Sequence, residues 1–121
     1  MHELAAVVFG PTVPDGNTAV AAIRLAEACL NHAGAVADRE DGEVSPGQLG
    51  ELLTGLNLTQ SQIVQCAEHL ARQARRRLHP RRSGNTAGKT ELLVDMLLQA
   101  GERGQLAAAH LNEARLLLDA G

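Results

Sequence analysis

The chain has 121 residues, the size of one small domain, and its 45% hydrophobic residues are enough to bury a core. One Phe and no Tyr or Trp leave Leu, Val, Ile and Ala to fill that core, which favours packed helices over a sheet. Two Cys do not make a disulfide framework. No apolar run approaches the roughly 18–20 residues of a membrane span. The N-terminal stretch has no basic region typical of a signal peptide. We therefore expect a cytoplasmic protein without a membrane partner.

The first part of the chain predicts a short N-terminal arm at 1–16, followed by a helix. The arm contains the apolar run Leu4–Phe9, which we expect to dock on the rest of the protein. Asn17 or Thr18 can cap the helix, which should run to about Ala33 and end at Gly34. An acidic loop is then expected at residues 35–45.

The middle of the chain predicts two helices separated by a turn. Ser45 is a good cap and Pro46 is favoured at the first helical position, so a second helix should run from there to about Thr54 and end at Gly55. Thr59 should cap a third helix, which His79-Pro80 stops near Leu78. The apolar positions of the third helix lie within one third of its circumference. They are Ile63, Val64, Ala67, Leu70, Ala71, Ala74 and Leu78.

The last part of the chain predicts two more helices after a polar loop at 81–88. A fourth helix should span about residues 89–100 and end at Gly101, and a fifth should span about residues 103–119. The predicted fold is therefore all-α, a bundle of four to five helices with the short arm in front of it. Residues 1–121 should form a single helical domain, with the bundle at 17–119 and neighbouring helices antiparallel.

The charge distribution is uneven and indicates an anionic partner. The net charge is −3, yet no acid lies between Glu68 and Glu91. That interval holds seven bases, which are Arg72, Arg75, Arg76, Arg77, Arg81, Arg82 and Lys89. Bases near a helix C-terminus also complement the helix dipole, but that role needs only two or three of them. The surplus predicts a site for nucleic acid or for an acidic protein surface.

The segment at 47–73 resembles bacterial helix-turn-helix segments. The resemblance rests on a first helix that ends in Leu-Leu and on the sequence Leu-Thr-Gln-Ser-Gln-Ile that opens the second, although Thr54–Thr59 is longer than the usual turn. It implies that Gln60, Ser61 and Gln62 face base edges while the Arg run contacts phosphates. More broadly, the chain resembles small, uncharacterised helical proteins of actinobacteria.

Two Cys-x-x-His pairs are the most specific metal-binding pattern in the chain. They are Cys29 with His32 and Cys66 with His69, on two different predicted helices. Residues three apart share a helix face, so two such pairs could give zinc a tetrahedral site. The alternative is that both Cys are free thiols and both His are solvated, and it is the preferred one because His69 lies on the outer face of its helix. We therefore expect no cofactor.

Other motifs are incomplete. The segment Ser83–Thr90 resembles a phosphate-binding loop, but it lacks the first Gly and the preceding strand. The acidic segment at 38–49 resembles a calcium loop, but it lacks carboxylates at the first and last ligand positions. No arrangement typical of nucleophilic or acid–base catalysis is present, so we do not expect an enzyme.

The predicted fourth helix is apolar on two sides. Leu92, Leu93, Met96, Leu97 and Ala100 fill one face, while Val94 and Leu98 lie on another. Such a helix is either central or at an interface, and the second option predicts a homodimer through Val94 and Leu98.

The sequence as a whole predicts a non-enzymatic binding or regulatory protein that acts through protein–protein contacts. Its partner should be a second copy or another protein. The alternative is a nucleic-acid-binding regulator that uses the helix at 60–78 and its Arg-rich end.

Overall fold

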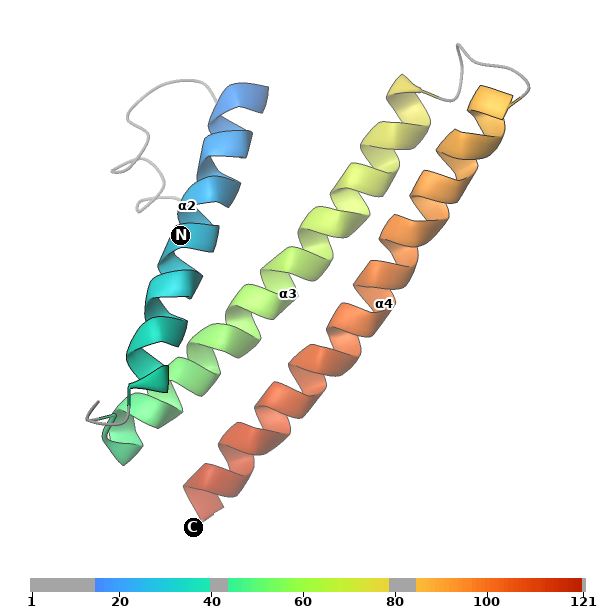
Figure 1. Cartoon of the computed structure of the whole chain (residues 1–121). Coiled ribbons are helices and arrows are strands. Elements are labelled where there is room, and N and C mark those ends of the chain that lie inside the picture. Colours follow the sequence, from blue (N-terminus) through green and yellow to red (C-terminus); the bar gives the residue numbers. More distant parts are fainter. Residues whose placement is uncertain (1–14, 40–43, 79–84, 121) are drawn as a thin grey trace. The chain divides into compact units, whose positions relative to one another are not determined.

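The structure is a computed structural model of the chain and describes residues 15–39, 44–78 and 85–120. These residues form three α-helices and no strand (Figure 1). The helices are α2 (Gly16–Asp38), α3 (Pro46–Arg77) and α4 (Asn85–Ala120). The all-α prediction is confirmed for this part of the chain, but the prediction of four to five helices is wrong. The predicted N-terminal arm lies outside the described residues except for its last two, Asp15 and Gly16, which begin α2.

The start of α2 is fixed by Asp15 rather than by Asn17 or Thr18. The Asp15 carboxylate accepts a hydrogen bond from the Thr18 backbone N–H at 2.9 Å, and the Thr18 hydroxyl accepts one from the Asp15 N–H at 2.9 Å. This reciprocal capping box satisfies two N–H groups that would otherwise lack partners. The helix does not end at Gly34, which lies inside it with no atom near enough to contact an added Cβ. Residues 35–38 of the predicted acidic loop are therefore helical.

The start of α3 confirms the predicted cap. The Ser45 hydroxyl accepts a hydrogen bond from the Gln48 N–H, the Gln48 side chain accepts one from the Ser45 N–H, and Pro46 occupies the first helical position. The predicted turn between two helices is wrong, because α3 continues through Gly55 and Thr59 to Arg77. Its C-terminal end agrees with the prediction.

The two predicted helices after the polar loop are one helix. α4 begins at Asn85, inside the predicted loop, and continues through Gly101 and Gly104 to Ala120. A glycine inside a helix costs only about 1 kcal/mol relative to Ala, so favourable packing can offset it. Gly101 and Gly104 both lie against Val64 of α3, where a small residue lets the two helices approach closely.

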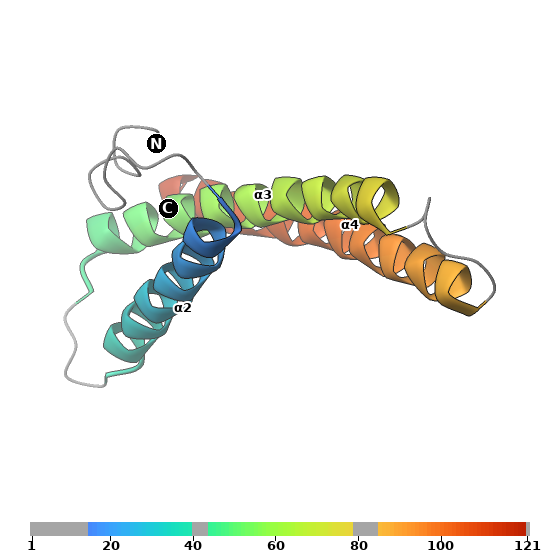
Figure 2. The same ribbon diagram turned by 90° about the horizontal axis from the view of Figure 1, so that it is seen from above.

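The chain divides into two compact units, residues 1–44 and 45–121. The first unit contains α2, in which no side chain is buried. The second is an antiparallel hairpin of α3 and α4, which lie side by side in both views (Figures 1 and 2). The single domain at 1–121 remains a prediction. None of the helices in the described ranges is both long enough and apolar enough to cross a membrane.

The seam of the hairpin repeats every seven residues and is built from small side chains. On α3 the buried positions are Val64, Ala71 and Ala74. On α4 they are Thr90, Val94, Gly101 and Gly104. Gly50 of α3 faces Leu118 of α4, and Val64 of α3 faces Gly104 of α4. From the first facing pair to the second, α3 advances by fourteen residues while α4 goes back by fourteen. This spacing is typical of two helices packed as a coiled coil.

Candidate interaction surfaces on the hairpin

The hairpin has a polar side and an apolar side, which flank its seam. The polar side is marked by shallow hollows between the helices. One hollow of about 440 Å³ is lined by Glu68, Arg72 and Arg75 of α3 and by Leu98, Glu102 and Gln105 of α4, together with Ala71. Beside it, Ser61 and Gln65 line a second hollow. Charged and amide side chains form most of the lining of these two hollows, which is typical of a solvated face.

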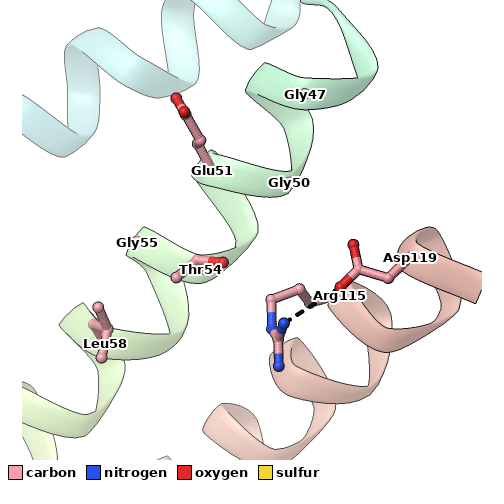
Figure 3. Close-up of a pocket in the computed structure, with 8 residues that line it drawn as sticks. All are labelled: Gly47, Gly50, Glu51, Thr54, Gly55, Leu58, Arg115 and Asp119. Carbon is pink, nitrogen blue, oxygen red and sulfur yellow. Dashed lines mark hydrogen bonds and ion pairs between the residues drawn. The ribbon is translucent and has the colours of Figure 1, made fainter.

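A third hollow lies on the polar side near the ends of the hairpin that are far from the α3–α4 connection (Figure 3). Its α3 wall is formed mainly by small residues, among them Gly47, Gly50 and Gly55. Arg115 of α4 borders it and donates hydrogen bonds to Asp119 at 3.3 Å and to Asn112 at 3.1 Å. The guanidinium is thus held by its own helix, and the hollow presents no free cation to a ligand.

The opposite flank of the seam carries a row of exposed apolar side chains on α3. Leu49, Leu56, Ile63 and Leu70 follow one another at intervals of seven residues, and each is 40–52% exposed. Each residue of this row comes immediately before a seam position in the sequence. The residues that line the polar hollows, such as Glu68, come after seam positions instead. Helical geometry places these two sets on opposite flanks of the hairpin.

α4 contributes a second apolar row to the same flank. Leu93, Ala100 and Ala107 are exposed and also recur every seven residues, with the exposed Met96 beside them. We call the two rows together the apolar side of the hairpin. Its members are Leu49, Leu56, Ile63 and Leu70 of α3 and Leu93, Met96, Ala100 and Ala107 of α4. The exposed Arg103 lies seven residues after Met96 and thus borders these rows. Exposed apolar side chains gathered on one flank of a folded protein indicate a contact surface.

The residues predicted for self-association lie in two different environments. Val94 is only 1% exposed and packs with Ala71 and Ala74 in the hairpin core, so it is not available to a second copy. Leu98 is 37% exposed and lines the polar hollow. The two residues therefore do not form one free face, and self-association through Val94 would require the hairpin to open.

The Arg cluster lies at the end of α3 that leads to the α4 connection. Arg72, Arg75, Arg76 and Arg77 are exposed, as is Lys89 near the start of α4. The Arg72 guanidinium donates a hydrogen bond to Nδ1 of His69, one turn earlier. Arg81 and Arg82 lie outside the described residues.

The residues predicted to read DNA bases lie inside the continuous helix α3 and do not begin a separate helix. Gln60 lies at the seam, where its amide nitrogen would be 2.9 Å from a Cβ on Gly104. Ser61 donates its hydroxyl hydrogen to the backbone carbonyl of Asn57 at 3.1 Å, and only Gln62 is exposed. Because α3 has no turn between 54 and 59, the helix-turn-helix geometry is absent from this segment.

The Cys-x-x-His pairs are divided between the two units. Cys29 and His32 are exposed on α2, and Cys66 and His69 are exposed on α3. Within the described ranges, no group of three or more His, Cys, Asp or Glu side chains could hold a metal ion.

The apolar side was missed by the sequence analysis although its signal was present. The seven-residue spacing from Leu49 to Leu70 crosses Gly55 and Thr59, where two helices were expected to meet. Once a break is assumed there, the four residues belong to different helices and no row is visible.

Comparison with protein-family models, with curated proteins and with solved structures finds no match to this chain.

Proposed function

We propose that this chain is a non-enzymatic binding protein that acts through the apolar side of the α3–α4 hairpin, in the cytoplasm. The single observation that carries the proposal is the row of half-exposed Leu and Ile side chains at seven-residue spacing on α3. This spacing is the seam pattern of one helix packed against another, and α4 occupies only the neighbouring seam. The row is thus suited to a helical protein partner.

Burial of the α3 row against a partner is energetically favoured over its permanent exposure to water. Complete burial of a Leu or Ile side chain contributes about 1.5–3 kcal/mol, and each residue in the α3 row has roughly half of that still to gain. Four such residues, with Leu93 and Met96 of α4 beside them, supply several kcal/mol to an association. That amount is large compared with what a scattered surface Leu contributes.

A photo-crosslinking amino acid at Ile63 tests this function. Introduced there in the native cells, it should give an adduct with a protein partner upon irradiation, because Ile63 lies in the middle of the α3 row. The matched control is the same amino acid at Leu58, which is 62% exposed on the polar side of the same helix. We expect adducts from position 63 and none from position 58. Equal labelling at both positions, or no adduct from either, would contradict the proposal.

Binding of duplex nucleic acid is a second candidate function, favoured by the exposed Arg cluster. Four Arg within six residues, together with Lys89, create a local positive potential of the kind that attracts phosphates. Glu68 and Glu102 share a hollow with Arg72 and Arg75 and partly neutralise them. Arg76 and Arg77 do not line that hollow and are the stronger phosphate-binding candidates.

A salt titration tests the second function. If the cluster binds duplex DNA of arbitrary sequence, the logarithm of the binding constant should fall with the logarithm of salt concentration by about 0.9 per phosphate contacted. The variant Arg76→Ala/Arg77→Ala should then reduce that slope by up to about 2. Arg103→Ala, an exposed Arg in the middle of α4, is the control and should leave the slope unchanged. Absence of DNA binding at low salt would rule this function out.

A further inference from the structure

We infer that the partner on the apolar side is a second copy of this chain, packed antiparallel so that two hairpins form a four-helix arrangement. The inference rests on the proposed function, because it names the partner of the same surface. The two helices of the hairpin enclose only the seam between them. The apolar side needs another layer of secondary structure to cover it. A second copy supplies a layer with the same seven-residue repeat.

The size of the apolar side suits a dimer. The α3 row runs from Leu49 to Leu70, which corresponds to about 32 Å at the helical rise of about 1.5 Å per residue. Two helices side by side are about 20 Å wide, so the footprint is roughly 600 Å² per chain. Stable interfaces bury about 600–1,000 Å² on each partner. The surface is therefore large enough for a specific homodimer.

The repeat on α3 suits self-pairing in an antiparallel sense. Leu56 and Ile63 lie symmetrically about the middle of the row, with Leu49 and Leu70 at its ends. A two-fold axis through that middle places α3 against α3 of the partner copy, so that each Leu or Ile meets another from the opposite end of the row. Such an interface is isologous and closes after two copies.

The charges at the two ends of the hairpin favour the antiparallel orientation over the parallel one. The end near the α3–α4 connection, described at 68–77 and 85–95, holds five bases and three acids, a balance of +2. The opposite end, at 45–60 and 106–120, holds three acids and one base, a balance of −2. An antiparallel pair brings unlike ends together, whereas a parallel pair brings the two Arg clusters together. Electrostatic complementarity of this kind sets orientation more than affinity.

The molecular mass of the full-length protein in solution tests the inference. Light scattering should give twice the 12.7 kDa of one chain. The variant Leu56→Glu/Ile63→Glu should give 12.7 kDa with an unchanged circular dichroism spectrum, because both side chains are half-exposed beside the hairpin seam and are not part of its buried core. Leu58→Glu on the polar side is the matched control and should remain a dimer. A monomeric wild-type protein at high concentration, or a dimeric double variant, would overturn the inference.

Spin labels on the wild-type apolar side test the orientation even if the double variant fails to fold. With Cys29 and Cys66 changed to Ser, a single label is placed at the exposed position Gln73. Two labels at position 73 of an antiparallel dimer should be about 40 Å apart, given a helical rise of about 1.5 Å per residue. A short distance between two labels at position 73 would instead show a parallel pair.

The failures of this inference and of the proposed function are distinguishable. A wild-type monomer whose Ile63 crosslinks to a different protein would remove the second copy as partner and leave the binding function in place. A wild-type monomer with no crosslink at Ile63 would remove both.

Discussion

Replacement of Val94 by Asp should unfold the α3–α4 hairpin or destabilise it by at least about 3 kcal/mol, because the change puts a carboxylate into an apolar seam. Val94 is 1% exposed and packs with Ala71 and Ala74. An effect of this size is a large part of the 5–15 kcal/mol that typically stabilises a folded protein. Urea denaturation followed by circular dichroism measures it directly.

The matched control is Leu98→Asp, one helical turn further along α4. Leu98 is 37% exposed at a polar hollow, so an Asp there stays hydrated. That hollow holds two acids, Glu68 and Glu102, and two bases, Arg72 and Arg75, whose effects on an added carboxylate oppose each other. We expect a loss of at most about 1 kcal/mol, mainly from the apolar contact that Leu98 no longer makes. Equal effects of the two substitutions on the free energy of unfolding would contradict the placement of Val94 in the seam.

The substitution Gly104→Ala should destabilise the hairpin by about 1–3 kcal/mol, even though Ala is the better helix former. A Cβ at this position would lie 2.6 Å from Cγ2 of Val64 and 2.9 Å from the side-chain nitrogen of Gln60. The Gln60 amide can swing away, but Val64 is β-branched and buried, so the helices themselves must separate. Thermal and urea denaturation should both show the loss.

Two comparisons isolate the steric cause. Gly55→Ala, where an added Cβ meets nothing within 4 Å, should stabilise the protein by about 0.5–1 kcal/mol. The double variant Gly104→Ala/Val64→Ala removes the methyl that clashes, so its loss should be smaller than the sum of the two single losses. Additive losses, or a stabilising Gly104→Ala, would show that the helices do not approach closely at this point.

The sequence supports the helical class and several helix ends. The scarcity of aromatic residues, with a single Phe, and the abundance of Ala and Leu predicted an all-α fold, and the described residues confirm it. Ser45 and Pro46 marked the start of α3 correctly, because the capping box that Ser45 forms with Gln48 is a local interaction among neighbouring residues. The end of α3 was also predictable, since Pro80 disfavours helix in the residue before it.

The number of helices was wrong because glycine was treated as a helix end. Gly34, Gly55 and Gly101 each lie inside a continuous helix. A glycine ends a helix only when the residues after it have a lower free energy in a non-helical conformation. That free-energy difference depends on tertiary packing. At Gly101 the packing partner is Val64 of α3, 37 positions earlier in the chain, which no local pattern reveals.

The candidate surface was only partly predictable for a related reason. The apolar stripe of the predicted third helix contained both buried residues, such as Val64 and Ala71, and exposed ones, such as Ile63 and Leu70. Periodicity shows that a face is apolar, but it does not show how many partners divide that face. For the same reason Val94 and Leu98 were assigned to one face. α3 buries Val94 in the seam but leaves Leu98 partly exposed.

The register of the hairpin also determines which contacts between α3 and α4 cost the least chain entropy to form first. Contact between Ala74 and Val94 closes a loop of about 20 residues, whereas contact between Gly50 and Leu118 closes one of about 68. The longer closure costs about 1 kcal/mol more chain entropy if it forms first. The buried cluster of Ala71, Ala74 and Val94 lies toward the end with the shorter closure. Chain entropy and core burial thus favour the same folding nucleus. The remaining turns of α3 and α4 can then pair in sequence, starting from this nucleus.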